Sequence, residues 1–215
     1  QGVLHLRINE WPFILEDGLD KAVELRARLS GNEKIRVNTV KAFMDGVSSN
    51  YSAWMLEPFA DKPGEVGYPV IDPAKLEPLV VEADRLGFQV ATHAIGTRAV
   101  RTMLDMYEKA EKTNGKRDAR HRLEHIETSH PDDRPRFAQL GVIASMTPLH
   151  CTADLEGYYI SRLGNNGHLG FAWKSFLENN AHLSFGTDWP AVDLKEPSPL
   201  QQIFGAVTRC TPQNY

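Results

Sequence analysis

Cysteine is scarce in this chain of 215 residues, in which only Cys151 and Cys210 occur. Two cysteines cannot form a disulfide framework, and such low usage is typical of a reducing compartment, so we expect a cytoplasmic protein. The absence of an apolar run of 18 residues and of a charged-then-apolar leader predicts neither a membrane-spanning helix nor secretion. Basic residues are not in excess, since 24 Lys and Arg against 28 Asp and Glu leave a net charge of −4. We therefore expect no nucleic-acid partner and no membrane partner.

A glycine-rich nucleotide loop is also missing, because Gly164, Gly167 and Gly170 are spaced too widely and follow no strand. What the chain does have is an alternation of apolar, strand-length runs with segments of helical periodicity. This alternation predicts an α/β fold with a parallel sheet, either an open doubly wound sheet or a (β/α)8 barrel. The expected strands are Val3–Ile8, Ile35–Met44, Phe88–His93, His121–Ile126, Val142–Met146 and His182–Gly186. The expected helices are Leu19–Leu29, a segment between Asp72 and Gly87, Thr97–Lys112, His130–Leu140 and Trp173–Asn180.

Two long connections interrupt this alternation, Asp45–Val70 and Thr147–Gly170. The first is rich in Gly, Pro and Ser. Connections longer than about 15 residues inside a compact domain are usually functional or mobile. We therefore expect both segments to be loops that serve a site.

Ionisable residues lie at or near the carboxyl ends of four expected strands: Lys41, His93, His125 and Asp188. The carboxyl ends of parallel strands share one face of an α/β fold, so these side chains should converge. Two neutral imidazoles and a carboxylate are suitable ligands for a divalent metal such as zinc. Such a metal would lower the pKa of a coordinated water to roughly 7.

Each of these residues also has an ordinary structural interpretation. A single strand-end histidine is more often a hydrogen-bonded structural residue, and Asp188, followed by Trp-Pro, could cap a turn. A lysine within an apolar run is harder to explain, because burial of an ammonium group is costly. Lys41 could still reach the surface or pair with Asp45. The set taken together favours a site more strongly than any one member does.

Five ordered motifs resemble the metal-dependent amidohydrolase superfamily, and in particular amidohydrolase family 3, which contains N-substituted formamide deformylase-like proteins. These motifs are Val40-Lys-Ala-Phe-Met-Asp-Gly46, His93-Ala-Ile-Gly96, His121-Arg-Leu-Glu-His125, Gly186-Thr-Asp-Trp-Pro190 and Ala206-Val-Thr-Arg209.

The resemblance implies a (β/α)8 barrel of the TIM type that holds one or two divalent metal ions, zinc in the first place, with iron or manganese as alternatives. It implies metal ligation by Lys41, His93, His125 and Asp188, with Lys41 carbamylated if it bridges two ions. Asp188 would also be the catalytic base. Beside these residues, His150 and Trp189 are candidates for contact with a small-molecule substrate.

The sequence departs from the family pattern in two respects. No two of its eight histidines are spaced as His-x-His, the pair expected at the first barrel strand. In addition, Thr97 follows Gly96 where the family has Asp. We therefore expect residues 1–215 to form one partial barrel domain of about six of the eight βα units, strands 3 to 8, within a fragment of a longer hydrolase.

These observations favour a metal-dependent hydrolase acting on a C–N bond of an amide, urea or cyclic amide, although the chain by itself could be inactive. A second hypothesis is a metal-free, aldolase-like barrel that uses Lys41 as a Schiff-base amine. The third is a non-catalytic, incomplete barrel that forms a homo-oligomer through its open edge.

Overall fold

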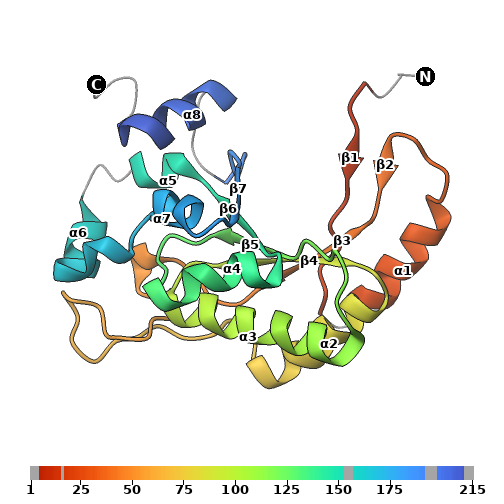
Figure 1. The fold of residues 1–215 in the computed structure, drawn as a ribbon, viewed down its shortest axis with the longest axis horizontal. Coiled ribbons are helices and arrows are strands. Elements are labelled where there is room, and N and C mark those ends of the chain that lie inside the picture. Colours follow the sequence, from red (N-terminus) through yellow and green to blue (C-terminus); the bar gives the residue numbers. More distant parts are fainter. Residues whose placement is uncertain (1–4, 16, 153–156, 192–197, 211–215) are drawn as a thin grey trace.

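A five-stranded parallel sheet forms the centre of the molecule in a computed structural model, which describes residues 5–15, 17–152, 157–191 and 198–210. Each strand pairs with the next one along the chain, so the strand order is the sequence order (Figure 1). The inner strands are largely buried, as expected of a parallel sheet covered by helices. The strands are β3 (Thr39–Phe43), β4 (Gln89–Ala94), β5 (Arg122–His125), β6 (Ile143–Met146) and β7 (His182–Phe185).

Helices connect successive strands and cover the outer face of the sheet, with α2, α3 and α4 side by side below it in Figure 1. Helix α2 begins where the sequence predicts, since the Asp72 side chain accepts a hydrogen bond from the backbone N–H of Ala74. It continues through Pro78, so this proline does not delay its start. The helices are α1 (Gly18–Arg28), α2 (Pro73–Arg85), α3 (Thr97–Asn114), α4 (Arg134–Leu140), α5 (Pro148–Thr152), α6 (Tyr158–Leu163), α7 (Trp173–Glu178) and α8 (Pro199–Thr208).

The beginning of the chain differs from the prediction. The expected strand Val3–Ile8 is wrong in its bounds: the strand observed is β1 (Ile8–Asn9), and residues 3 and 4 lie outside the described part of the chain. The expected strand Ile35–Met44 is divided into β2 (Ile35–Arg36) and β3, and β1 pairs with β2 in a separate two-stranded sheet. A different segment lies beside β3, because Lys41 N–H donates to Pro12 O and Ile14 N–H donates to Lys41 O.

The second predicted long loop, Thr147–Gly170, is wrong as a loop, because it contains α5, α6 and a 3₁₀ helix at Gly164–Leu169. In the first predicted loop, Asp45–Val70, the only helical segment is a short 3₁₀ turn at Ser48–Asn50. Helix α8 was not predicted, although Ser198 followed by Pro199 is a typical start signal and the Ser198 hydroxyl accepts a hydrogen bond from Leu200 N–H. In the ranges described, no helix combines the length and the apolarity needed to cross a bilayer.

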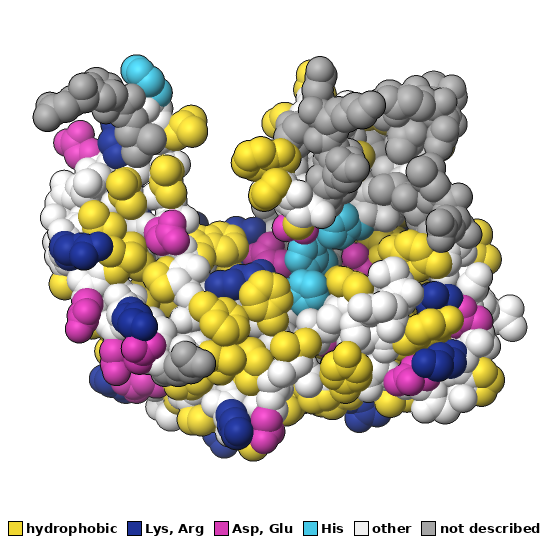
Figure 2. Space-filling view, turned by 180° about the vertical axis from the view of Figure 1, so that it is seen from behind, with side chains coloured by type: hydrophobic (Ala, Val, Ile, Leu, Met, Phe, Trp, Pro, Cys, Tyr) yellow, Lys and Arg dark blue, Asp and Glu magenta, His cyan; other side chains and the backbone are white. Residues whose placement is uncertain are grey.

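Two projecting parts flank the inner face of the sheet, one formed by β1, β2 and α1 and the other including α8 (Figure 1). Viewed from behind, the molecule is hollowed between them, and histidine side chains gather at the floor of this hollow (Figure 2). Within the described residues the sheet runs from β3 to β7 without closing on itself. The carboxyl ends of its strands therefore remain accessible from the hollow.

Candidate metal centre

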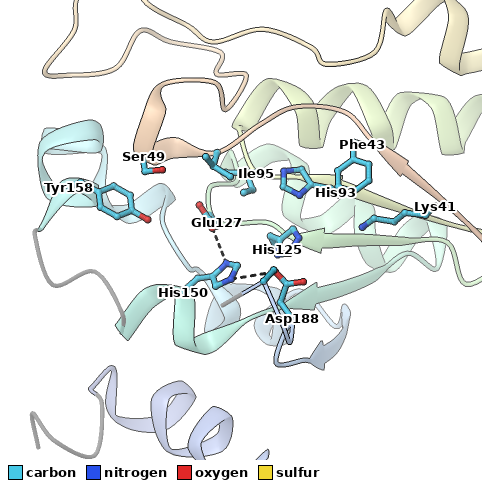
Figure 3. Close-up of a pocket in the computed structure, with 12 residues that line it drawn as sticks. Lys41, Phe43, Ser49, His93, Ile95, His125, Glu127, His150, Tyr158 and Asp188 are labelled. Carbon is cyan, nitrogen blue, oxygen red and sulfur yellow. Dashed lines mark hydrogen bonds and ion pairs between the residues drawn. The ribbon is translucent and has the colours of Figure 1, made fainter. Parts of the chain in front are cut away.

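A pocket of about 540 Å³ lies at the carboxyl ends of the strands. Its polar residues come from β3, β4 and β5, from the segments after β3, β5 and β7, and from α5 and α6, and Figure 3 shows these side chains pointing toward a common space. The predicted convergence of strand ends is therefore observed. The pocket is lined by Lys41, Phe43, Val47, Ser49, His93, Ile95, His125, Glu127, His150, Tyr158, Asp188 and Ala191.

His93 comes from β4 and is fixed by the backbone of the segment after β3. Its Nε2 lies 2.9 Å from the carbonyl oxygen of Gly46, which can only accept, so Nε2 carries the proton and Nδ1 keeps its lone pair. Burial lowers the pKa of His93, which favours the neutral ring. A neutral imidazole with one free lone pair is the form in which histidine binds a metal ion.

Asp45 organises the backbone around His93. This carboxylate is 2 % exposed and accepts hydrogen bonds from the backbone N–H groups of Trp54, Ile95 and Gly96 at 2.8 to 2.9 Å. Asp45 therefore ties the end of β3 to the turn between β4 and α3. Among the described residues Asp45 forms no ion pair with Lys41, whose ammonium group lies over the ring of Phe43 instead.

His125 ends β5 with a backbone φ of 75°, in the left-handed region that a histidine seldom adopts. Strict alternation along β5 would direct His125 away from the face that carries His93, and this local turn accompanies its entry into the pocket. The two rings are 4.7 Å apart. Burial, together with His93 and His150, holds the pKa of His125 well below its usual value. Its Nδ1 atom is buried and has no hydrogen-bond partner among the residues that the structure describes.

His150 on α5 stands between two carboxylates. Its Nδ1 is 3.0 Å from Glu127 Oε1, and its Nε2 is 3.7 Å from Asp188 Oδ2 (Figure 3). The ring also stacks on His125, with 5.3 Å between the centroids. Asp188 follows β7 with a φ of 55°. The structure therefore brings together three of the predicted residues, His125, His150 and Asp188.

Lys41 lies on β3 with its ammonium group over the ring of Phe43, 4.9 Å from the centroid. Burial lowers its pKa, whereas the negative charges of Glu124 and Asp188 raise it. Glu124 is level with His93 in the sheet register, so it belongs to the inner face, where it pairs with Arg122 at 2.5 Å. The lysine thus lines the same pocket as the histidines.

Trp189 lies next to Asp188, but its side chain is 64 % exposed and does not belong to the lining of this pocket. Its substrate contact stays a prediction. Sequence reasoning missed Glu127, Tyr158 and Ser49 as lining residues. For Glu127 a signal existed, since an acidic residue two positions after a strand-end histidine also falls at the carboxyl edge of the sheet.

The donor set of the pocket fits a divalent metal ion. Ligand atoms from His125, His150 and Asp188 all lie within 4.8 Å of one another. The orphaned Nδ1 of His125 and the free Nδ1 lone pair of His93 add nitrogen donors beside them. Imidazole nitrogens with one carboxylate are typical ligands of zinc and of other first-row divalent metals. This chemistry agrees with the predicted type of site.

Comparison with known proteins places the chain in a family. The sequence profile of the Amidohydrolase family matches residues 1–215, so the chain belongs to the amidohydrolase family. The protein LONG AFTER FAR-RED 3 of Arabidopsis thaliana is 37% identical over 212 residues, which are 98% of this chain and 35% of that protein. The N-substituted formamide deformylase of Arthrobacter pascens is 29% identical over 147 residues, 68% of this chain and 26% of that enzyme.

A solved structure agrees with the fold. A metal-dependent hydrolase from Pyrococcus furiosus superposes with a TM-score of 0.80 at 28% sequence identity, over 99% of this chain and 41% of that one. The predicted incomplete (β/α)8 barrel is thereby confirmed as the fold class. The chain spans only about a quarter to two-fifths of the length of these relatives.

Proposed function

We propose that the chain is part of a metal-dependent hydrolase that cleaves a C–N bond in a small amide, urea or cyclic amide. The observation that carries this proposal is the convergence of Lys41, His93, His125, His150 and Asp188 on one pocket at the strand ends. The relative from Arthrobacter pascens, an N-substituted formamide deformylase by name, supports the choice of a C–N bond. The family membership supports hydrolysis.

In this proposal His93, His125 and Asp188 hold the metal, and Lys41 joins them when carbamylated, because a carbamate is an anionic oxygen ligand. A divalent ion bound there, zinc or alternatively iron or manganese, would polarise the substrate carbonyl and acidify water. Asp188 accepts the proton of the attacking water. Its carboxylate is partly exposed to the pocket, so it can then donate this proton to the nitrogen of the leaving group.

His150 and the apolar side chains of the pocket bind the substrate in this proposal. His150 is only partly exposed and faces the pocket between Glu127 and Asp188. Phe43, Val47 and Ile95 supply apolar contacts on the other side. A pocket of about 540 Å³ suits a small molecule rather than a polymer.

Elemental analysis of protein purified without chelator is the first test. We expect close to one or two divalent ions per chain, and a loss of most of the metal in His125→Asn and in Asp188→Asn. His182→Asn is the matched control, because this exposed histidine lies at the opposite end of β7. The proposal fails for this chain if reconstituted protein holds no metal, or if all three variants retain it equally.

A substrate test follows for metal-loaded protein. Release of an amine from N-substituted formamides, simple amides, ureas and cyclic amides would support C–N hydrolysis. The Schiff-base hypothesis, which the lowered pKa of Lys41 favours, makes a different prediction. It requires that borohydride trap a carbonyl compound on wild-type protein and not on Lys41→Met.

A further inference from the structure

Glu127 is a buried carboxylate that the proposed chemistry does not use. It is 5 % exposed, and the Tyr159 hydroxyl donates a hydrogen bond to its Oε2. Its other oxygen, Oε1, faces Nδ1 of His150 at 3.0 Å. Its backbone is fixed as well, since Phe171 N–H donates to the carbonyl oxygen of Glu127 at 2.8 Å. The carboxylate is therefore held rigidly between α5 and α6.

This arrangement determines which nitrogen of His150 carries the proton. A carboxylate that already accepts from Tyr159 can satisfy His150 only by accepting again, so the ring donates from Nδ1. The other nitrogen, Nε2, then presents a lone pair. Nε2 lies 3.7 Å from Asp188 Oδ2, so two hydrogen-bond acceptors face each other with no proton between them. Two acceptors at this separation are suited to a shared cation.

We infer that Glu127 is a positioning residue, which locks His150 in the Nδ1–H tautomer and so directs its Nε2 lone pair to a cation shared with Asp188 and His125. Histidines that bind metals commonly donate their second nitrogen to a carboxylate in this way. The cation part of the inference rests on the proposed function and changes it at one residue, because His150 becomes a ligand of the cation instead of a substrate contact. The tautomer part does not, because it follows from the contacts of Glu127 alone.

The same chain provides a histidine of the opposite tautomer for comparison. In His121, Nδ1 accepts a hydrogen bond from Val90 N–H at 3.0 Å, and Nε2 lies 3.2 Å from Asp84 Oδ1. His121 must therefore carry its proton on Nε2. It lies outside the pocket, so a change at Glu127 should leave its signals in place.

Long-range ¹H–¹⁵N NMR of histidine-labelled protein tests the tautomer directly. Spectra are recorded without metal at pH 8.5, above the ordinary imidazole pKa of about 6.5, and His150 is assigned from His150→Asn. We expect the Nδ1–H pattern for His150 and the Nε2–H pattern for His121. In Glu127→Leu the Nδ1–H pattern of His150 should be lost. In Tyr159→Phe, which keeps the carboxylate, it should persist.

An Nε2–H pattern for His150 in the wild type overturns the inference, as does an unchanged Nδ1–H pattern in folded Glu127→Leu. The wild-type spectrum tests the tautomer of His150 even if Glu127→Leu does not fold.

Cobalt(II) titration tests the cation part, with an expected loss of affinity of about 10- to 100-fold in Glu127→Leu and little change in Tyr159→Phe. Equal affinities in both variants and the wild type would overturn that part. If no protein binds cobalt, the proposed function fails, and the NMR result still decides the role of Glu127.

Discussion

Lys41 is the residue whose chemistry depends most on its surroundings. Its amine lies over the ring of Phe43 in the pocket that the histidines also line, and burial lowers its pKa. A larger share of the amine is therefore neutral near pH 8 than for an exposed lysine. Neutral amines react with carbon dioxide to form carbamates, which is the form in which Lys41 would bind a metal.

We expect a carbamate carbon signal in ¹³C NMR of the protein supplied with labelled bicarbonate at pH 8. The signal should be absent from Lys41→Met and should persist in Lys34→Met, which removes an exposed lysine from the segment before β2. A spectrum of Lys41→Met identical to that of the wild type would contradict carbamylation at this position.

The residues of the pocket differ in how well the sequence predicts them. His93, His125 and Asp188 follow from position alone, because each ends a strand or follows it closely. His150 lies on α5, in a segment predicted to be a loop, so its contacts with Glu127 and Asp188 depend on tertiary structure. Glu127 was missed although its position two residues after His125 places it at the carboxyl edge of the sheet, because the sequence does not show that its carboxylate is buried.

The turn between β4 and α3 shows how closely two elements approach at the pocket. Gly96 is the N-cap of α3, and a Cβ atom placed on it would lie 2.2 Å from Trp54 O. The same carbonyl oxygen accepts hydrogen bonds from the N–H groups of Arg98 and Ala99. Any side chain at position 96 must therefore push the 52–56 backbone away from the first turn of α3.

Gly96→Ala should consequently lower the free energy of unfolding by about 2 kcal/mol or more, as is usual for forced overpacking. Urea unfolding measures this loss. Gly167→Ala is the control, because in the described part of the chain no atom beyond its own neighbouring backbone lies within 4 Å of its added Cβ, and its φ is not positive. Equal stability of the two variants would contradict the close approach.

Asp84 connects the end of α2 with α3 and β5 through three side chains. It accepts hydrogen bonds from Asn114, Arg117 and His121. Burial would raise its pKa, but the hydrogen bonds of His121 and Asn114 and the charge of Arg117 outweigh this and lower the pKa to about 2. A carboxyl pKa below the unfolded value stabilises the folded chain above that value.

Asp84 should contribute about 2 kcal/mol to the free energy of unfolding above pH 4. This contribution should disappear as the pH falls through 2. Asp84→Asn should therefore be less stable than the wild type at pH 7, and the difference should shrink below pH 4. Urea midpoints measured from pH 7 down to pH 3 provide the test. Glu33→Gln, which alters an exposed carboxylate in the turn before β2, should show no such trend. A constant difference for Asp84→Asn would contradict this linkage.

The elements themselves were predicted unevenly. The strand cores and the bounds of α1, α2 and α3 follow from hydrophobic periodicity and from end signals such as Asp72 and Gly87. The strand expected at Val3–Ile8 was displaced, because the hydrogen bonds beside β3 come from Pro12 and Ile14 in a segment without strand periodicity. The position of this strand depends on pairing with residues distant in the sequence. Local hydrophobic periodicity contains no information about such pairing.

At the scale of the whole molecule, apolar side chains remain exposed on one helix. On α8, Leu200 is 74 % exposed, Ile203 56 % and Val207 78 %. These residues lie three to four positions apart, which places them on one face of the helix. The central sheet also ends at β7, which pairs only with β6 in the part of the chain that the structure describes. Both features favour self-association of the chain.

We expect sedimentation velocity to show an average mass that rises with protein concentration. Ile203→Glu combined with Val207→Lys should shift the chain toward the monomer by placing charges on this face. A double substitution of exposed polar residues, Glu33→Lys with Lys34→Glu, should not. A wild-type chain that remains monomeric at all concentrations would contradict the expectation.

The pocket draws on two kinds of backbone. Its floor stands on β3, β4 and β5, whereas Val47, Ser49 and Tyr158 belong to the connecting segments that form its wall. The residues that would bind a metal and those that would contact a substrate therefore lie largely in different segments of the chain. Descendants of this chain could acquire new substrates by exchanging Val47, Ser49 and Tyr158 with their segments, while Lys41, His93 and His125 stayed in place on the strands.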